Sequence, residues 1–173
     1  MATNIDPLLQ RVQTSYERLT LVASNLNSVS DDLGKVVNAL DESLKKLNIG
    51  ITTWYRFSLG SNDADPGAYL YKYIGYSRMG NKWGISLRRE DGHEAYKETE
   101  TVDQWLFNDA PRELRLEAVT HIPAMIDALI QAGEEEIEKI GLKTLEAKQL
   151  AAILSPTTKQ ASKPSVLNPG GER

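Results

Sequence analysis

Basic and aromatic residues gather in the segment between Asp65 and Glu90, which contains no acidic residue between these two ends. Its cationic residues are Lys72, Arg78, Lys82, Arg88 and Arg89, and its rings are Tyr69, Tyr71, Tyr73, Tyr76 and Trp83. Guanidinium and ammonium groups bind phosphate, and aromatic rings stack on planar bases. The composition of this segment therefore predicts a site for a small anionic, nucleotide-like ligand.

The predicted ligand-binding residues combine this segment with two arginines at the start of the following helix, where backbone amides also favour an anion. They are Tyr71, Lys72, Tyr73, Arg78, Trp83, Arg88, Arg89, Arg112 and Arg115. A purely structural interpretation stays open, because aromatic residues are favoured in strands and basic residues can balance acidic helices.

The sequence contains no recognisable catalytic or metal-binding motif. It has neither a glycine-rich phosphate loop nor a Gly-x-Ser-x-Gly elbow, and it has no cysteine. The histidines, His93 and His121, each lack a second histidine at metal-ligand spacing. The acidic loop over 62–67 lacks the glutamate that a calcium loop requires. We therefore expect a non-enzymatic protein with no metal and no cofactor.

Length and charge restrict the classes of partner. The chain has 173 residues and a formal net charge of −4, whereas general binders of extended nucleic acid or of anionic membranes are usually basic. We expect neither partner. The first residues lack a hydrophobic signal core, and no apolar run is long enough to cross a bilayer. These features predict a cytoplasmic protein.

A seven-residue repeat of apolar side chains organises the first 50 residues. Its members are Val12, Leu19, Leu26, Leu33, Leu40 and Leu47. Such spacing predicts a long helix that packs along its length on another helix. Weak helix formers are frequent between Ser24 and Gly34, so this packing must supply the stability. The partner is a helix of the same chain or another copy, and self-association is predicted through Leu19, Leu26, Leu33 and Leu40.

The remaining chain predicts a small sheet and further helices. Residues 51–58, 68–76 and 82–89 alternate and are rich in β-branched and aromatic side chains, and 94–101 is a candidate fourth, edge strand. Helical spacing returns over 108–154, with a kink expected near Pro123. Residues 155–173 have the composition of a flexible tail.

The predicted fold class is therefore α+β, with two long amphipathic, coiled-coil-like helices flanking an antiparallel β-meander of three or four strands. The predicted organisation is one structural domain with a long helix over 1–50, the meander over 51–107, the helical section over 108–154 and the tail over 155–173.

Short stretches in the second half of the chain carry a resemblance. They are the run Lys82-Trp83-Gly84-Ile85, then Trp105, and then the run from Asp109 to Leu116 that leads into a long helix rich in Glu and Lys. Over roughly residues 69–154 the chain resembles small uncharacterised bacterial and phage mobile-element proteins. The resemblance implies a bacterial or phage setting, and it assigns no activity and no catalytic residue.

These observations leave two functions open. The first is a homo-oligomeric, non-enzymatic binding protein that sequesters a small nucleotide-like anion; in a phage setting, this would be a nucleotide signal used in host defence. The alternative is a structural or adaptor protein that acts through its helical surfaces on a protein partner. An enzyme that acts on a nucleotide through carboxylates finds no supporting motif.

Overall fold

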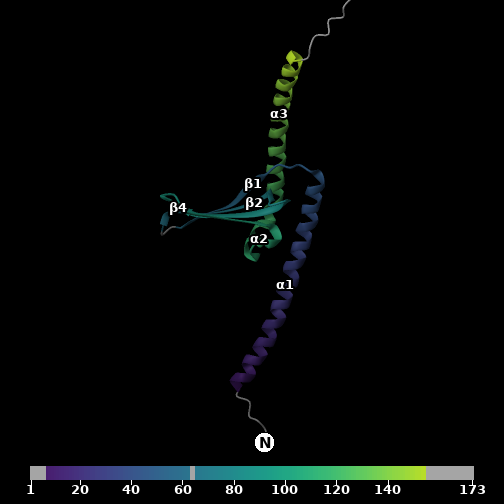
Figure 1. Cartoon of the computed structure of the whole chain (residues 1–173). Coiled ribbons are helices and arrows are strands. Elements are labelled where there is room, and N and C mark those ends of the chain that lie inside the picture. Colours follow the sequence, from purple (N-terminus) through teal and green to yellow (C-terminus); the bar gives the residue numbers. More distant parts are fainter. Residues whose placement is uncertain (1–6, 63–64, 155–173) are drawn as a thin grey trace, which may run out of the picture. The chain divides into compact units, whose positions relative to one another are not determined.

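The computed structural model describes residues 7–62 and 65–154. One long helix precedes a four-stranded sheet and a C-terminal helical section (Figure 1). The elements are α1 (Pro7–Leu47), β1 (Thr53–Asn62), β2 (Asp65–Met79), β3 (Lys82–His93), β4 (Tyr96–Leu106), the 3-10 helix η1 (Phe107–Asp109), α2 (Arg112–Ala118), the 3-10 helix η2 (Val119–His121) and α3 (Ile122–Leu154). The predicted tail over 155–173 lies outside the described residues.

The chain divides into two compact units within α3, after Glu134. The first unit contains α1, the sheet, α2 and the beginning of α3. The second contains the remainder of α3. The whole of α1 and all four strands therefore belong to the first unit.

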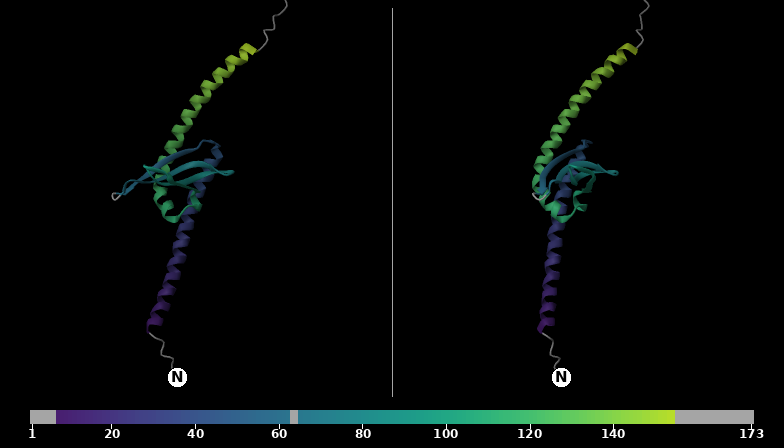
Figure 2. Two further views of the ribbon diagram at one scale, coloured as in Figure 1. Left: turned by 60° about the vertical axis from the view of Figure 1, so that its left-hand side comes forward. Right: turned by 90° about the vertical axis from the view of Figure 1, so that its left-hand side faces the viewer.

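The sheet is an antiparallel meander in the order β1-β2-β3-β4 (Figure 2). Its central pair is β2 and β3, in which Ile74 lies opposite Leu87 and Tyr76 lies opposite Ile85. These four residues alternate along their strands, so their side chains point to the same face of the sheet. That face is the one buried in the core.

Helices from three parts of the chain cover this face. The core residues that they contribute are Val37 from α1, Leu114 and Ala118 from α2, and Ile122, Met125 and Leu129 from α3. Burying one large apolar side chain contributes about 1.5–3 kcal/mol to stability. The sheet is therefore the layer that joins segments far apart in the sequence.

Only the second half of α1 takes part in this packing. Its buried residues are Ser30, Gly34 and Val37, and Gly34 allows the side chain of Asn108 to approach the helix backbone closely. Every described residue of α1 before Ser30 is exposed. Figure 2 shows this first half extending away from the sheet.

The prediction of coiled-coil-like helices is wrong. The structure contains α1, then the four-stranded sheet, then the C-terminal helix α3, and no coiled coil occurs in the part of the chain that is described. The heptad residues Leu19 and Leu26 are exposed, whereas Leu33 packs against the core of the sheet. A repeating apolar stripe establishes that one face of a helix needs cover, but it does not establish that the cover is another helix.

The C-terminal helical section begins with two short elements rather than one continuous helix. The helix α2 ends at Ala118, η2 follows, and α3 starts at Ile122. Pro123 thus lies in the first turn of α3, where its missing N–H removes no intrahelical hydrogen bond.

A carboxylate of α1 completes the hydrogen bonding of the sheet where β4 has ended. The last residue of β4, Leu106, pairs with Ser86, and the next β3 amide, that of Ile85, donates to Asp41 Oδ1 at 2.8 Å. Asp41 Oδ2 also pairs with Lys45 Nζ at 2.8 Å. Asp41 therefore fixes α1 against a strand edge that would otherwise hold an unpaired amide.

We predict that Asp41→Ala lowers the free energy of unfolding by about 1–3 kcal/mol, because it leaves the Ile85 amide unsatisfied. Urea denaturation measures the loss. Glu42→Ala is the matched control, because Glu42 pairs with the same Lys45 at 2.9 Å but is exposed; its loss stays below about 0.5 kcal/mol. Equal losses in the two variants would contradict this role of Asp41.

Candidate functional site

The structure separates the predicted ligand-binding residues, and several of their charges are used within the chain. On the helix-covered face, Lys72 Nζ pairs with Glu117 of α2 at 2.7 Å, and Arg89 pairs with Asp103 of β4 at 2.7 Å. Arg78 donates to Asn81 at the β2–β3 turn, at 3.0 Å. The positive charge of this sequence segment is thus distributed over two faces and an end of the sheet.

The two predicted arginines of α2 hold that helix against α1. Arg112 donates to the side chain of Asn27 at 2.8 Å, and Arg115 donates to Ser30 Oγ at 3.0 Å. The Nε atoms of both arginines are buried and have no hydrogen-bond partner among the described residues. These side chains form an internal contact between helices and lie apart from the predicted tyrosines.

Three predicted residues, Tyr71, Tyr73 and Arg88, do come together on the face of the sheet opposite the core. In the strand register, Tyr73 lies between Arg56 of β1 and Arg88 of β3, and Tyr71 lies opposite Glu90. With Trp54, these side chains form a group that we call the outer cluster. Its members are Trp54, Arg56, Tyr71, Tyr73, Arg88 and Glu90.

Both guanidinium groups of the outer cluster lie over aromatic rings. The Arg56 Cζ atom is 5.1 Å from the centroid of the Tyr71 ring, and the Arg88 Cζ atom is 5.6 Å from that of Tyr73 and 5.9 Å from that of Trp54. The Trp54 ring in turn covers Gly75, where any Cβ would fall 2.5 Å from the ring. These cation–π contacts orient the arginines before any ligand arrives.

The two arginines differ in how far their charge is compensated. Arg88 is ion-paired with Glu90, and the Tyr73 hydroxyl donates to Glu90 Oε2 at 2.7 Å. Within the described residues, the exposed Arg56 side chain has a ring contact but neither an ion pair nor a hydrogen bond. Arg56 is therefore the cation of the outer cluster whose hydrogen-bond donors remain available.

Tyr73 is held in its neutral form by its surroundings. Burial, the hydrogen bond to Glu90 and the negative charge of Glu90 together raise the pKa of Tyr73 to about 12, against weaker opposing effects of Arg56 and Arg88. The phenol therefore remains a hydrogen-bond donor to Glu90 at neutral pH. This bond fixes Glu90 beside Arg88.

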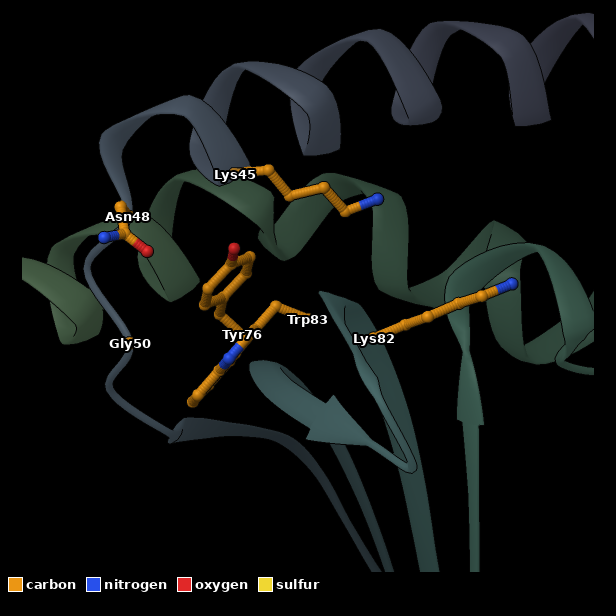
Figure 3. Close-up of a pocket in the computed structure, with 6 residues that line it drawn as sticks. All are labelled: Lys45, Asn48, Gly50, Tyr76, Lys82 and Trp83. Carbon is orange, nitrogen blue, oxygen red and sulfur yellow. The ribbon is translucent and has the colours of Figure 1, made fainter.

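A separate cavity of about 340 Å³ lies where the C-terminal end of α1 meets the β2–β3 turn (Figure 3). It is lined by Lys45, Asn48, Gly50, Tyr76, Lys82 and Trp83. The rings of Tyr76 and Trp83 are stacked, with centroids 5.7 Å apart and planes inclined by 16°. In Figure 3 the side chains of Lys45 and Lys82 run in the same direction, away from these rings.

The charges around this cavity do not favour an anionic ligand over a neutral one. Lys45 already pairs with Asp41 and Glu42, and a neighbouring cavity of about 280 Å³ that shares Lys45 and Lys82 is also lined by Asp41 and Asp109. Trp83, which the sequence analysis placed in the ligand site, therefore lines a cavity in which the charge of Lys45 is already balanced by carboxylates. The outer cluster matches the predicted ligand chemistry better.

The four predicted oligomerisation residues also separate. Leu33 is partly buried and packs against the core, whereas Leu19, Leu26 and Leu40 are 63%, 48% and 42% exposed. The chain itself covers the apolar stripe of α1 only where the sheet and α2 reach it.

Sequence reasoning missed Trp54 and Arg56, which belong to the outer cluster but precede the basic segment. Their signal was present, because residues two apart on a strand share a face. Pairing the strand over 51–58 with the next strand would have placed Arg56 among the tyrosines. That step requires the register of β1 on β2, including its irregularity between Arg56 and Ser58.

Comparisons of the chain with protein-family models, with curated proteins and with solved structures found no match. Over residues 7–62 and 65–154, no group of three or more His, Cys, Asp or Glu side chains could hold a metal ion. No helix within the same residues is long and apolar enough to cross a membrane. The outer cluster and the exposed part of α1 are thus the two candidate functional surfaces of the chain.

The raised pKa of Tyr73 predicts a loss of stability at alkaline pH. An unfolded tyrosine ionises near pH 10, and the folded Tyr73 does so near 12. The stabilisation by neutral Tyr73 is thus complete below about pH 10 and is lost as the pH rises through 12. In urea unfolding across this range, Tyr73→Phe should lose part of the pH dependence of the wild-type protein. Tyr96→Phe, at an exposed tyrosine of β4, is the control, and the same change in both variants contradicts the assignment.

Proposed function

We propose that this chain is a non-enzymatic binding protein that assembles with further copies of itself and holds a small nucleotide-like anion on the outer cluster. The observation that carries the ligand proposal is the Arg56 side chain, which lies over Tyr71 and has no ion pair with any residue of 7–62 or 65–154. Two arginines and one glutamate give the outer cluster a net charge of +1, which favours an anion.

The chemistry of the outer cluster suits a ligand with one planar part and one anionic part. A guanidinium stacked on a ring retains a planar set of N–H donors that match the oxygens of phosphate or carboxylate. The partly exposed ring of Trp54 offers a surface for a base, whereas the ring of Tyr71 is already stacked on that of Tyr69, with centroids 4.7 Å apart. The chain as a whole carries −4, so a compact ligand is favoured over a long polyanion.

Sequestration is the form of binding that we propose. The ligand is held and released unchanged, and its free concentration falls with the amount of protein. In the phage or mobile-element setting that the resemblance implies, the ligand would be a nucleotide signal. Recovery of the intact nucleotide after incubation is the outcome expected of a binding protein, and a converted product would assign an enzyme instead.

We predict that Arg56→Ala weakens nucleotide binding at least tenfold, because a charge-assisted hydrogen bond contributes about 1.5–3 kcal/mol. Isothermal titration calorimetry with adenosine monophosphate, adenosine and inorganic phosphate, followed by a panel of cyclic and linear nucleotides, measures this. Both parts of the nucleotide are needed, so adenosine and phosphate alone should bind more weakly.

The matched control for this experiment is Arg89→Ala. Arg89 follows Arg88 directly but lies on the opposite face, where it pairs with Asp103. Binding should be unchanged in this variant. The ligand proposal is abandoned if no nucleotide in the panel binds, and the outer cluster is abandoned as its site if both variants lose affinity equally.

The proposal of self-assembly rests on the exposed apolar side chains of α1. Those before Ser30 are Leu8, Leu9, Val12, Tyr16, Leu19, Leu21, Val22, Leu26 and Val29. Of these, Val12, Leu19 and Leu26 recur at every seventh residue and so share one side of the helix, and contiguous exposed apolar surface of this kind marks an interaction site. Because an isolated helix with many weak formers is marginal in water, this segment needs a partner to remain helical.

We predict that Leu19→Lys reduces the molar mass from that of an oligomer to that of a monomer, because it places a charge in the apolar surface. Light scattering on the purified protein measures the mass. Thr14→Lys is the matched control, since Thr14 is exposed and lies on the polar side of the same helix. A wild-type protein that is already monomeric contradicts the proposal of self-assembly.

A second candidate function is a structural or adaptor protein that binds another protein through its helices. It is favoured by the apolar side chains that α3 also exposes in the second unit, among them Ile137, Ile140, Leu150 and Ile153. If the chain is an adaptor, Arg56→Ala should leave binding to the protein partner unchanged, and polar substitutions on the exposed apolar side of the helices should abolish it. The nucleotide titration therefore separates the two candidates.

A further inference from the structure

The apolar side of α1 is one continuous stripe whose spacing alternates between three and four residues. Its members are Leu9, Val12, Tyr16, Leu19, Ala23, Leu26, Ser30, Leu33, Val37, Leu40, Leu44 and Leu47. Such a series lies on one side of a helix. The stripe is thus longer than the part of it that the chain itself covers.

The boundary between the covered and the free part is sharp. From Ser30 onward, the stripe residues Ser30, Leu33, Val37 and Leu44 are buried or packed against the core, with Val37 only 2% exposed, whereas Leu40 and Leu47 remain exposed. The hydrogen bonds of Arg115 to Ser30 and of Arg112 to Asn27 are the first links from α1 to α2. Before Asn27 the same stripe continues with the same apolar character but is exposed.

We infer that the free part of this stripe is covered by the same segment of a second copy, with the two helices antiparallel. In this arrangement Leu9 lies opposite Leu26 of the second copy, Val12 opposite Ala23, and Tyr16 opposite Leu19. The inference rests on the proposed self-assembly and gives it a surface, a direction and a register.

The stripe is complementary to its own reversed sequence. Each of the three pairings joins two residues that present carbon surface, and the overlap runs from Leu8 to Asn27. It ends at the residue where α2 begins to contact α1. The charged residues of this segment, Arg11, Glu17 and Arg18, lie outside the stripe and stay in water.

The contacts of α1 with its own chain decide the direction of pairing. From Ser30 onward, α2 and the sheet cover the stripe at Ser30, Leu33, Val37 and Leu44. A parallel second helix on the stripe would continue into the part that α2 and the sheet cover. The sheets of the two copies would then lie side by side at the same end of the helix pair. With an antiparallel second helix the overlap ends at Asn27, and the sheets of the two copies lie at opposite ends of the helix pair.

The area of the free stripe is sufficient for a specific dimer. Its large apolar side chains are Leu9, Val12, Tyr16, Leu19 and Leu26, and the exposed side chains of Leu8 and Val22 lie beside it. If each of them buries roughly 90 Å² of apolar surface, two copies together bury roughly 1,300 Å², which lies within the range of specific protein interfaces. An antiparallel contact of identical surfaces also closes at two copies and leaves no open end.

A second copy is also the partner that the helix requires. The free segment contains Ser24, Asn25, Asn27 and Ser28, all of which are weak helix formers. Its helical form therefore depends on a partner that is present whenever the chain is present. A second copy of the chain is such a partner, because it is present wherever the protein is made.

The absence of cysteine from the chain makes the arrangement testable by disulfide formation. The full-length variants Leu9→Cys and Leu26→Cys are oxidised separately and as an equimolar mixture. The mixture should give a mixed disulfide dimer, and each variant alone should give none, because disulfides need Cα atoms less than about 7 Å apart. Thr14→Cys, on the polar side, should cross-link with neither variant.

Other results overturn the inference in distinguishable ways. Efficient self-dimers of Leu9→Cys and of Leu26→Cys indicate parallel helices. A mixed dimer of Leu19→Cys with Ile140→Cys, formed in place of the expected one, makes α3 the occupant. An oligomer by light scattering without any of these cross-links leaves self-assembly intact and removes α1 as its surface, whereas a monomer removes self-assembly as well.

Discussion

The burial of a single face of the sheet is the constraint on which the other features depend. Ile74, Tyr76, Ile85 and Leu87 turn to one side, and helices from three parts of the chain cover them. The alternate residues must then point to the other face. The outer cluster exists because the chain supplies helices for one face of the meander and, in its described part, none for the other.

The same constraint explains why only the C-terminal half of α1 packs on the core. A helix of 41 residues spans about 60 Å, whereas four strands side by side span only about 20 Å. Asp41 fixes the C-terminal half of the helix at the edge of β3. The N-terminal half therefore passes beyond the core, and its apolar stripe has to be covered from outside the first unit or remain in water.

Local patterns in the sequence predicted the elements well and the relations between them poorly. Alternation located the strands, and the heptad repeat located α1, because both patterns report which side of an element is apolar. The repeat did not show that Leu33 and Leu44 pack against the core of the sheet rather than on a helix, since both environments favour leucine. The coiled-coil expectation failed at this step.

The predicted ligand-binding residues do not all lie together, for a related reason. Arg88 and Arg89 are adjacent in sequence and therefore occupy opposite faces of the sheet, where they pair with Glu90 and Asp103 respectively. Lys72 is likewise paired with Glu117 of α2, which lies 45 residues further along the chain. An acid-free stretch of sequence is thus not an acid-free region in space. Only the register of β1 on β2 shows that Arg56, which has no ion pair among the described residues, lies beside Tyr73.

The two proposed surfaces are physically independent of each other. The outer cluster is built on β1, β2 and β3, whereas the free stripe lies on α1 before the first contact with α2. In the proposed antiparallel pair, the sheets of the two copies are separated by about twenty residues of helix, or about 30 Å. A single mononucleotide therefore cannot touch both outer clusters. In the proposed assembly, pairing of the helices therefore sets how many outer clusters one assembly carries, and in the proposed site the contacts of Arg56 set how tightly each outer cluster holds its ligand.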